Sequence, residues 1–337
     1  MARFAHVVSA IDTHTGGEPT RIVLSGLPPI PGATMAEKKR YLRERLDYLR
    51  TLLMLEPRGH GDMFGAILTP PTSASAHYGA LFMDATGYLD MCGHGTIGLT
   101  TMLIEMGIVP ATEPETTIAF DTPAGLVEGR ARVEGGKVIE VSVTNVASFL
   151  YARDVELDLP ALGPVAVDIA FGGNFFALVP APALGVAIQP AHAVRLAQLG
   201  MLVKRAINSK LKVQHPIEKH IQNVELVEIY ERPEPGQLRA RNVVIFGDGQ
   251  IDRSACGTGT SAAMAALYGR GELGLGQEFI NEGLLGTRFR GRLVRERWVG
   301  DYPAVEPIIT GQAYITGIQQ FVVDPDDPLA YGFALGR

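Results

Sequence analysis

The chain has 337 residues, of which 46% are hydrophobic and 20% charged, and its formal net charge is −6. This composition is typical of a soluble globular protein long enough for two domains. It offers no basic face for nucleic acid and no run of about 20 apolar residues for a membrane span. We recognise no secretory leader, so the expected location is cytoplasmic.

Short apolar runs between glycines and prolines indicate strands at residues 7–11, 22–24, 66–68 and 80–83. Residues 35–53 have a helical pattern. One face carries Leu42, Leu46, Leu49 and Leu53, and the rest carries Lys38, Lys39, Arg40, Arg43 and Arg45. Because acidic residues interleave with the basic ones, we predict a solvated surface helix and reject the alternative of a nucleic-acid face.

Each half of the chain contains a cysteine motif that opens a helix. Cys92-Gly-His-Gly-Thr96 leads into residues 97–106, and Cys256-Gly-Thr-Gly-Thr260 leads into residues 261–268. Both runs are apolar nearly all round, so we predict two buried helices. Strands are expected before the second motif at residues 166–170, 177–179, 224–230 and 242–246, with a turn at 233–236.

The two halves also match outside these motifs. The matched pairs are Asp12-x-x-x-Gly-Gly-Glu18 with Asp168-x-x-x-Gly-Gly-Asn174, Ile22-Val23 with Leu178-Val179, and Phe82 with Phe246, each ten residues before its cysteine. Matched motifs in the same order at similar spacing indicate an internal duplication. Cys92 and Cys256 therefore occupy equivalent positions in two related domains.

Cys92 and Cys256 are the two cysteines of the chain. Singly, each would be interpreted as a small buried hydrophobe, and two thiols without a Cys-x-x-Cys pair do not make a zinc site. The duplication instead favours chemistry. Backbone N–H groups and the helix dipole stabilise a thiolate at a helix start, so we expect the pKa of both thiols to lie below the ordinary value of about 8.5.

Two such helix starts facing across a cleft would direct several N–H donors at one anion between two thiols. An amino-acid carboxylate fits this description, with its α-carbon between the sulfurs. One thiolate would remove the α-proton while the other thiol protonates the opposite face. The pair would share one proton, so the two titrations should be coupled.

These motifs resemble those of the proline racemase family, which includes 4-hydroxyproline 2-epimerase and trans-3-hydroxyproline dehydratase. The matching segments are residues 12–21, 56–64, 91–96, 168–176 and 252–260. The resemblance implies an α+β, diaminopimelate-epimerase-like fold with two pseudo-symmetric domains, each a curved sheet around a central helix, and an active site in the cleft between them. The expected domains are residues 1–133 with 300–337, and residues 134–299. It further implies no cofactor, neither pyridoxal phosphate nor metal, and a homodimer, although no sequence feature defines an interface.

The resemblance also implies a role for individual residues. Cys92 and Cys256 match the catalytic acid and base, Gly93, His94, Gly257 and Thr258 match the backbone donors to the substrate carboxylate, and His94 and Asp252 match side chains near the ring nitrogen. A carboxylate there would pair with the secondary ammonium of the substrate. The alternatives are a helix-start role for His94 and a helix cap for Asp252.

Three further features bear on the substrate. Both cysteines are present, which favours inversion over elimination, because the dehydratase branch typically lacks one. Phe64, Phe82 and Phe246 match an apolar wall in the family, which favours proline over 4-hydroxyproline, although core packing would explain each one singly. Ala255 replaces the usual proline before Cys256, and this is expected to loosen the helix start. His60 and Asp62 could form a second acid–base pair, but we interpret them as structural or pocket-wall residues because the two thiols already supply acid and base.

The sequence therefore predicts a cofactor-independent isomerase that inverts the α-carbon of proline, a small-molecule substrate. The alternatives are a 4-hydroxyproline 2-epimerase, a trans-3-hydroxyproline dehydratase (a lyase) and a non-catalytic amino-acid-binding protein. The binding protein is disfavoured because binding alone needs the N–H donors and not the sulfurs.

Overall fold

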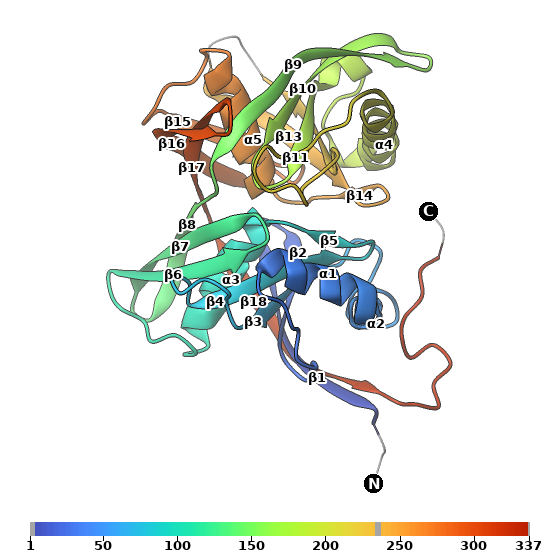
Figure 1. Cartoon of the computed structure of the whole chain (residues 1–337), viewed down its shortest axis with the longest axis vertical. Coiled ribbons are helices and arrows are strands. Elements are labelled where there is room, and N and C mark those ends of the chain that lie inside the picture. Colours follow the sequence, from blue (N-terminus) through green and yellow to red (C-terminus); the bar gives the residue numbers. More distant parts are fainter. Residues whose placement is uncertain (1–3, 233–236, 336–337) are drawn as a thin grey trace.

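The computed structural model describes residues 4–232 and 237–335, which form two lobes stacked along the long axis of the molecule (Figure 1). The turn expected at 233–236 lies outside the described residues. The first lobe contains β1 (His6–Thr15), β2 (Glu18–Ser25), α1 (Met35–Arg45), α2 (Asp47–Met54), β3 (Phe64–Thr69), β4 (Tyr78–Asp84), β5 (Tyr88–Leu89), α3 (Gly93–Glu105), β6 (Glu115–Thr122), β7 (Gly125–Glu134), β8 (Lys137–Thr144) and the late strand β18 (Ala313–Val323). The second lobe contains β9 (Ser148–Leu159), β10 (Gly163–Phe171), β11 (Phe175–Pro180), η1 (Ala181–Leu184), η2 (Pro190–His192), α4 (Ala193–Lys210), β12 (Leu226–Glu231), β13 (Arg239–Phe246), β14 (Gln250–Ile251), α5 (Gly257–Gly269), β15 (Glu278–Glu282), β16 (Arg288–Val299) and β17 (Tyr302–Gly311).

Strand pairing is continuous from one lobe to the other. In the first lobe the order of paired strands is β18, β1, β2, β3, β4, β6, β7 and β8. β8 then pairs with β17. From β17 the order continues through β16, β15, β13, β12, β11, β10 and β9, and β9 pairs back with β17. The sheet of the second lobe is thus closed on itself through the pairing of β9 with β17.

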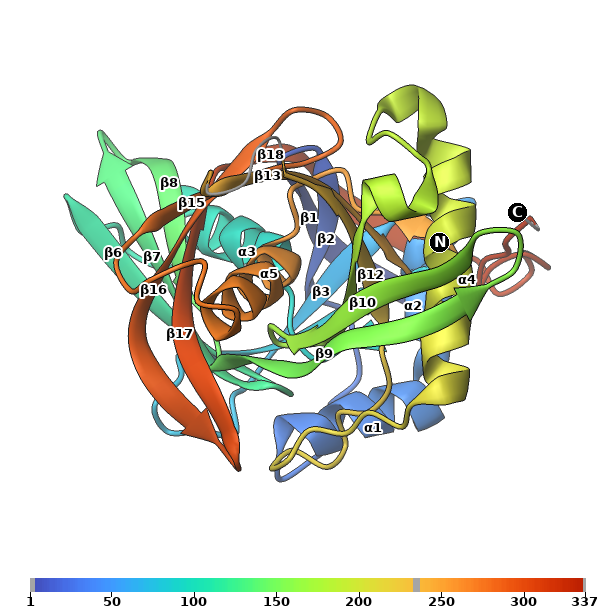
Figure 2. The same ribbon diagram turned by 90° about the horizontal axis from the view of Figure 1, so that it is seen from above.

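Each curved sheet encloses one helix. α3 packs against β8, β18 and β1, and α5 packs against β9, β17 and β10. Seen from above, both helices lie within the sheets, whereas α4 lies on the outside (Figure 2). Every residue of α3 from Gly93 to Ile104 is buried, as the lack of a polar face predicted. The α+β fold with a central helix in each half is confirmed.

The single helix predicted for residues 35–53 is wrong in two respects. The chain forms two helices, α1 and α2, because the backbone leaves the helical conformation at Leu46 (φ −130°, ψ 19°). In addition, Lys38 is buried, and its ammonium donates to Thr69 Oγ1 at 3.2 Å and to the Pro70 carbonyl at 2.7 Å. The basic side is therefore not uniformly solvated, whereas the leucine face is buried as expected.

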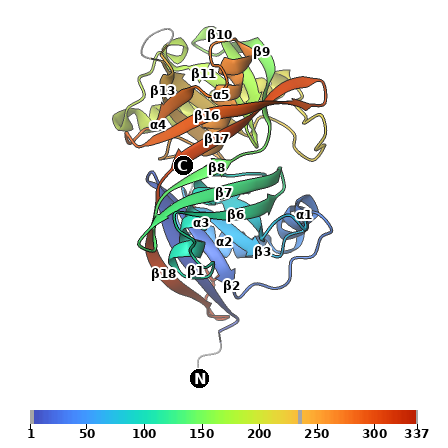
Figure 3. The same ribbon diagram turned by 90° about the vertical axis from the view of Figure 1, so that its left-hand side faces the viewer.

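The domain boundaries at 133/134 and 299/300 stay a prediction. β7 and β8 form a hairpin, paired from Glu134 with Lys137 to Glu128 with Thr144. Both strands lie with the first lobe in Figure 3, so a boundary after Thr144 would keep this hairpin whole. Within residues 4–232 and 237–335, the helices are too short or too polar to cross a membrane.

Candidate active site

The starts of α3 and α5 meet at the boundary between the lobes and enclose a small cavity. Its lining consists of Phe64, Leu89, Met91, Cys92, Gly93, His94, Leu226, Phe246, Asp252, Cys256, Gly257 and Thr258. Every site residue predicted from the sequence except Phe82 is among them. The cavity volume is about 20 Å³, which is room for about one water molecule.

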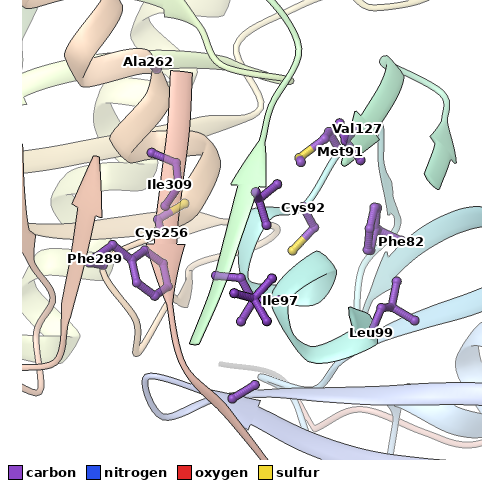
Figure 4. Close-up of a cluster of buried hydrophobic side chains, with 14 of the residues drawn as sticks. Phe82, Met91, Cys92, Ile97, Leu99, Val127, Cys256, Ala262, Phe289 and Ile309 are labelled. Carbon is purple, nitrogen blue, oxygen red and sulfur yellow. The ribbon is translucent and has the colours of Figure 1, made fainter. Parts of the chain in front are cut away.

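Each cysteine is the N-cap residue of its helix. Cys92 Sγ accepts a hydrogen bond from the Gly95 N–H at 3.2 Å, and Cys256 Sγ accepts one from the Gly259 N–H at 3.3 Å. Figure 4 shows the two side chains on the segments that lead into α3 and α5. The thiols therefore occupy equivalent positions, as the duplication predicted.

The backbone differs between the two cysteines. Cys92 is extended (φ −143°), whereas Cys256 has φ 55°, a conformation that residues other than glycine adopt rarely. Ser254 Oγ accepts a hydrogen bond from the Cys256 N–H at 3.0 Å and holds this turn. The carbonyl of Ala255 is bound as well, by Asn242 Nδ2 at 2.9 Å and Thr260 Oγ1 at 3.1 Å. These contacts restrain the segment in which alanine replaces the usual proline, and the expected loosening stays a prediction.

Glycines bring the two helix starts together. A β-carbon built on Gly93 would lie 2.6 Å from the α-carbon of Gly257, and one on Gly257 would lie 2.7 Å from the α-carbon of Gly93. The first N–H groups of a helix have no partner within the helix, and here two such sets converge on one cavity. The arrangement can bind a single anion from both lobes.

The prediction that the helix starts lower the pKa of both thiols is wrong for this closed site. Burial raises the pKa of Cys92 and of Cys256 well above the usual value. The N–H groups of Gly95 and Gly259 oppose this rise, but desolvation of the thiolate is larger. The negative charge of Asp252 raises the pKa of both thiols further.

His94 and Asp252 face the cavity with different partners. His94 Nδ1 lies 3.2 Å from Cys92 Sγ, and burial lowers the pKa of His94, so the imidazole is neutral. Asp252 Oδ1 accepts hydrogen bonds from the N–H and hydroxyl of Ser254 at 2.8 and 2.7 Å. The helix cap is Cys256 and not Asp252, so the alternative of a capping role for this aspartate is wrong.

The predicted aromatic wall is divided between two layers. Phe64 and Phe246 line the cavity with ring centroids 6.3 Å apart. Phe82 packs behind Phe64, with centroids 6.4 Å apart, and its ring lies against Gly95. Met91, together with Leu89 and Leu226, which the sequence did not single out, completes the apolar part of the lining.

The repeated Gly-Gly segments hold the opposite cysteine loop. Glu18 of the first lobe accepts a hydrogen bond from the Arg253 N–H at 2.8 Å, three residues before Cys256. Its counterpart Asn174 of the second lobe donates to the Met91 carbonyl at 2.7 Å and accepts from the Asp90 N–H at 3.1 Å. The duplicated motif therefore marks a pair of reciprocal contacts between the lobes.

Two buried carboxyl groups near the thiols were missed from the sequence. Burial raises the pKa of Glu18 well above its usual range, with a further contribution from Asp252, and the pKa of Glu228 to about 7. Glu18 lies in the repeated motif, which was a usable signal. Glu228 lies in an apolar strand without any local signature. Asp62 pairs with Arg253 at 2.9 Å, and neither it nor His60 lines the cavity.

Comparison with known proteins identifies the family of this chain. The family model described as Proline racemase matches residues 10–334. The chain is 53% identical to the proline racemase of Clostridioides difficile, over 99% of each protein. It is 46% identical to the 4-hydroxyproline 2-epimerase of Streptosporangium roseum, over 99% of this chain and all of that protein.

Among solved structures, the hydroxyproline epimerase of Agrobacterium vitis with bound trans-4-hydroxy-L-proline superposes with a TM-score of 0.94 at 34% identity, covering 99% of this chain and 97% of that one. The fold, the duplicated cysteine motifs and these similarities lead to one conclusion. This chain belongs to the proline racemase family.

Proposed function

We propose that the protein is an isomerase that inverts the α-carbon of free proline. The observation that carries the proposal is the single cavity lined by two thiols, two glycine-rich helix starts and an apolar wall. The higher identity to a proline racemase than to a 4-hydroxyproline 2-epimerase also supports proline.

In the proposed mechanism Cys92 and Cys256 act on opposite faces of the substrate. The thiolate of one removes the α-proton, and the electron pair of the broken C–H bond spreads into the carboxylate. The thiol of the other loses its proton to the opposite face, so its S–H bond breaks as the new C–H bond forms. In the reverse reaction the two roles are exchanged.

The backbone donors stabilise the charge that develops in this step. We assign the carboxylate to the N–H groups of Gly93, His94, Gly257 and Thr258, which are preorganised at the two helix starts. We assign the ring ammonium to the carboxylate of Asp252, beside the neutral imidazole of His94. An ammonium in a site this dry needs such a partner.

The proposed preference of the enzyme for proline over 4-hydroxyproline depends on the apolar wall of the cavity. Phe64, Phe246 and Leu226 offer no hydrogen-bonding group to a ring hydroxyl. A buried hydroxyl without a partner is unfavourable by about 1–3 kcal/mol. The 4-hydroxyproline 2-epimerase remains the second candidate because of the similarity in sequence and structure.

The size of the cavity bears on how substrate enters. A cavity of about 20 Å³ cannot admit a five-membered ring amino acid. We infer that the lobes separate to bind substrate and that the described arrangement is a closed one. Closure would exclude water from the two thiols.

The test is solvent isotope exchange. The enzyme is incubated in D₂O with L-proline, trans-4-hydroxy-L-proline and trans-3-hydroxy-L-proline separately, and each is followed by proton NMR at the α position and by polarimetry. Cys92→Ser and Cys256→Ser are run alongside, with Ala265→Ser as a control in a buried position of α5 outside the cavity lining. We expect deuterium at the α-carbon of proline with loss of rotation, abolished in both cysteine variants and retained in the control.

The other outcomes identify the alternatives. Exchange confined to 4-hydroxyproline would make the protein an epimerase and contradict the wall argument. A cyclic imine formed from the 3-hydroxy compound alone would mean a dehydratase. Binding of proline without any exchange would mean an amino-acid-binding protein.

Compartment and assembly are proposals as well. Two thiols that must stay reduced fit the cytoplasm, where disulfides are rare. A homodimer follows from the family resemblance alone, and light scattering of the purified protein would test it.

A further inference from the structure

Glu228 is a buried carboxyl group behind the Cys256 helix start. It lies in β12 with 1% of its surface exposed. Its Oε1 accepts a hydrogen bond from Asn242 Nδ2 at 3.0 Å, and Asn281 Nδ2 lies 3.5 Å away. Within the described part of the chain, Oε2 has no hydrogen-bond partner.

The unpartnered oxygen lies against the residue that holds the Cys256 sulfur. A β-carbon built on Gly259 would be 2.6 Å from Glu228 Oε2. The N–H of the same glycine donates to Cys256 Sγ at 3.3 Å. The carboxyl therefore packs on the side of the helix start that faces away from the cavity, next to the hydrogen bond that stabilises a thiolate.

At the position equivalent to Glu228 the first lobe has no carboxyl, and the buried carboxyl of this lobe that acts on Cys92 is Glu18 of the Gly-Gly segment. Ile22 and Leu178 are equivalent in the repeat, and their partners on the neighbouring strands are Ala66 and Glu228. Beside Gly95, the counterpart of Gly259, the closest group is the ring of Phe82. A duplicated framework thus places an apolar group behind one thiol and an acid behind the other.

We propose that Glu228 is a positioning residue for the shared proton: its buried carboxylate favours the protonated form of Cys256, so that in the free enzyme Cys256 is the acid and Cys92 the base. The proposal deepens the two-thiol function described above and rests on it. On this proposal the two thiols are unequal, although the repeat places them at equivalent positions.

The charged surroundings of both thiols agree with this assignment. After burial, the largest influence on the pKa of Cys92 is the Gly95 N–H, which lowers it, followed by Asp252 and Glu18, which raise it. For Cys256 the next influences are Asp252 and then Glu228, and both raise the pKa. Carboxylates precede the N–H donor in this order at Cys256 but follow it at Cys92, which supports Cys256 as the protonated thiol.

Other titratable groups face Glu228 from two sides. Cys256 and Asp252 lie toward the substrate cavity. A second cavity, of about 280 Å³, lies on the opposite side, and its charged and phenolic lining groups are Asp154, Asp168, Tyr230, Arg232, Arg270 and Glu272. Arg270 is paired with Asp168 and Asp154, and Arg232 with Glu272. The carboxylates of Asp154, Asp168 and Glu272 are thus paired with arginines. The carboxyl groups that act on Cys256 are Asp252 and Glu228.

The test is site-resolved alkylation of the free protein with iodoacetamide between pH 6 and 9, with each cysteine peptide quantified by mass spectrometry. Burial raises the pKa of Glu228 to about 7. In the wild type, Cys92 should react faster, and the ratio of Cys256 to Cys92 alkylation should fall as pH rises through about 7. In Glu228→Gln this fall should disappear, and above pH 7 the ratio should exceed the wild-type ratio by up to about tenfold, the effect of one pKa unit on a thiolate population.

A matched control is Glu225→Gln. Burial raises the pKa of Glu225 to about 7 as well, but this residue is not among the groups that act on Cys256. It should follow the wild type. Identical alkylation ratios in the wild type and Glu228→Gln across the pH range would overturn the proposal, and so would a wild-type ratio that rises with pH, even if the variant failed to fold. Alkylation needs no substrate, so this result is independent of whether proline is racemised.

Discussion

Gly93 and Gly257 touch across the boundary between the lobes, so closely that a methyl group on either would overlap the backbone of the other. Each is the first residue after a cysteine and the first residue of its helix. This contact sets the separation of the two helix starts and therefore of the two thiols. It explains why both copies of the motif need glycine at this position.

Gly93→Ala should prevent full closure of the site. The added β-carbon would meet Gly257 at 2.6 Å, and its three nearest atoms all belong to the backbone of Gly257 and Thr258, so they cannot move aside separately. A displacement of about 1 Å at a reacting centre lowers rates by about 100-fold, so we expect a loss of that size in kcat/KM for proline. Gly87→Ala is the control, because a β-carbon there meets nothing within 4 Å. An unchanged rate in Gly93→Ala would show that the glycines do not meet in the working enzyme.

Glu228→Gln should change how stability depends on pH. The folded-state pKa of about 7 lies above the ordinary 4.5, so the folded protein binds more protons between these values. The stabilisation from this group is present below about pH 4.5 and is lost as pH rises through 7, by an amount of the order of 3 kcal/mol. Urea unfolding at several pH values should show that the free energy of unfolding falls more steeply with rising pH in the wild type than in Glu228→Gln. Glu156→Gln, at an exposed site, controls for the removal of one charge.

His215 should act on stability in the opposite direction. Burial lowers its pKa to about 4, and its ring packs 4.6 Å from that of Phe171 while Nδ1 accepts a hydrogen bond from the Glu218 N–H at 2.9 Å. The neutral ring stabilises the fold above about pH 6.5, and this contribution, again of the order of 3 kcal/mol, is lost as pH falls to 4. In His215→Gln, unfolding between pH 4 and 7 should lack this component. If the free energy of unfolding changed equally with pH in the variant and the wild type, His215 would not be the source of this pH dependence.

Phe246→Ser should shift the substrate preference. The substitution adds a hydroxyl and opens the apolar wall of the cavity, so a ring hydroxyl gains a partner. We expect kcat/KM for proline to fall and the ratio for 4-hydroxyproline over proline to rise by about tenfold. Phe82→Leu is the matched control, since Phe82 packs one layer behind and should affect both substrates alike. If kcat/KM fell equally for both substrates in Phe246→Ser, the apolar wall would not determine the preference for proline.

Several elements of the fold were outside the reach of the sequence patterns. The strands β6 to β9 and β15 to β18 were not predicted, although β7 alternates between buried and more exposed positions and β18 between half-buried and exposed ones. They follow each central helix, where no motif directs attention. The break at Leu46 was missed because a leucine face continues through it, and the burial of Lys38 depends on a carbonyl and a hydroxyl from β3 and the loop after it.

The sequence by itself determined the duplication, the two cysteine helix starts and most of the cavity lining, because these depend largely on motifs whose residues are close together in the chain. Tertiary structure decided the rest. The pKa of each thiol depends on desolvation and on charges such as Asp252, and Glu228 approaches Cys256 only when β12 packs behind α5. Burial and electrostatic interaction act through space between residues far apart in the chain, so local pattern predicts where a thiol lies but not how readily it ionises.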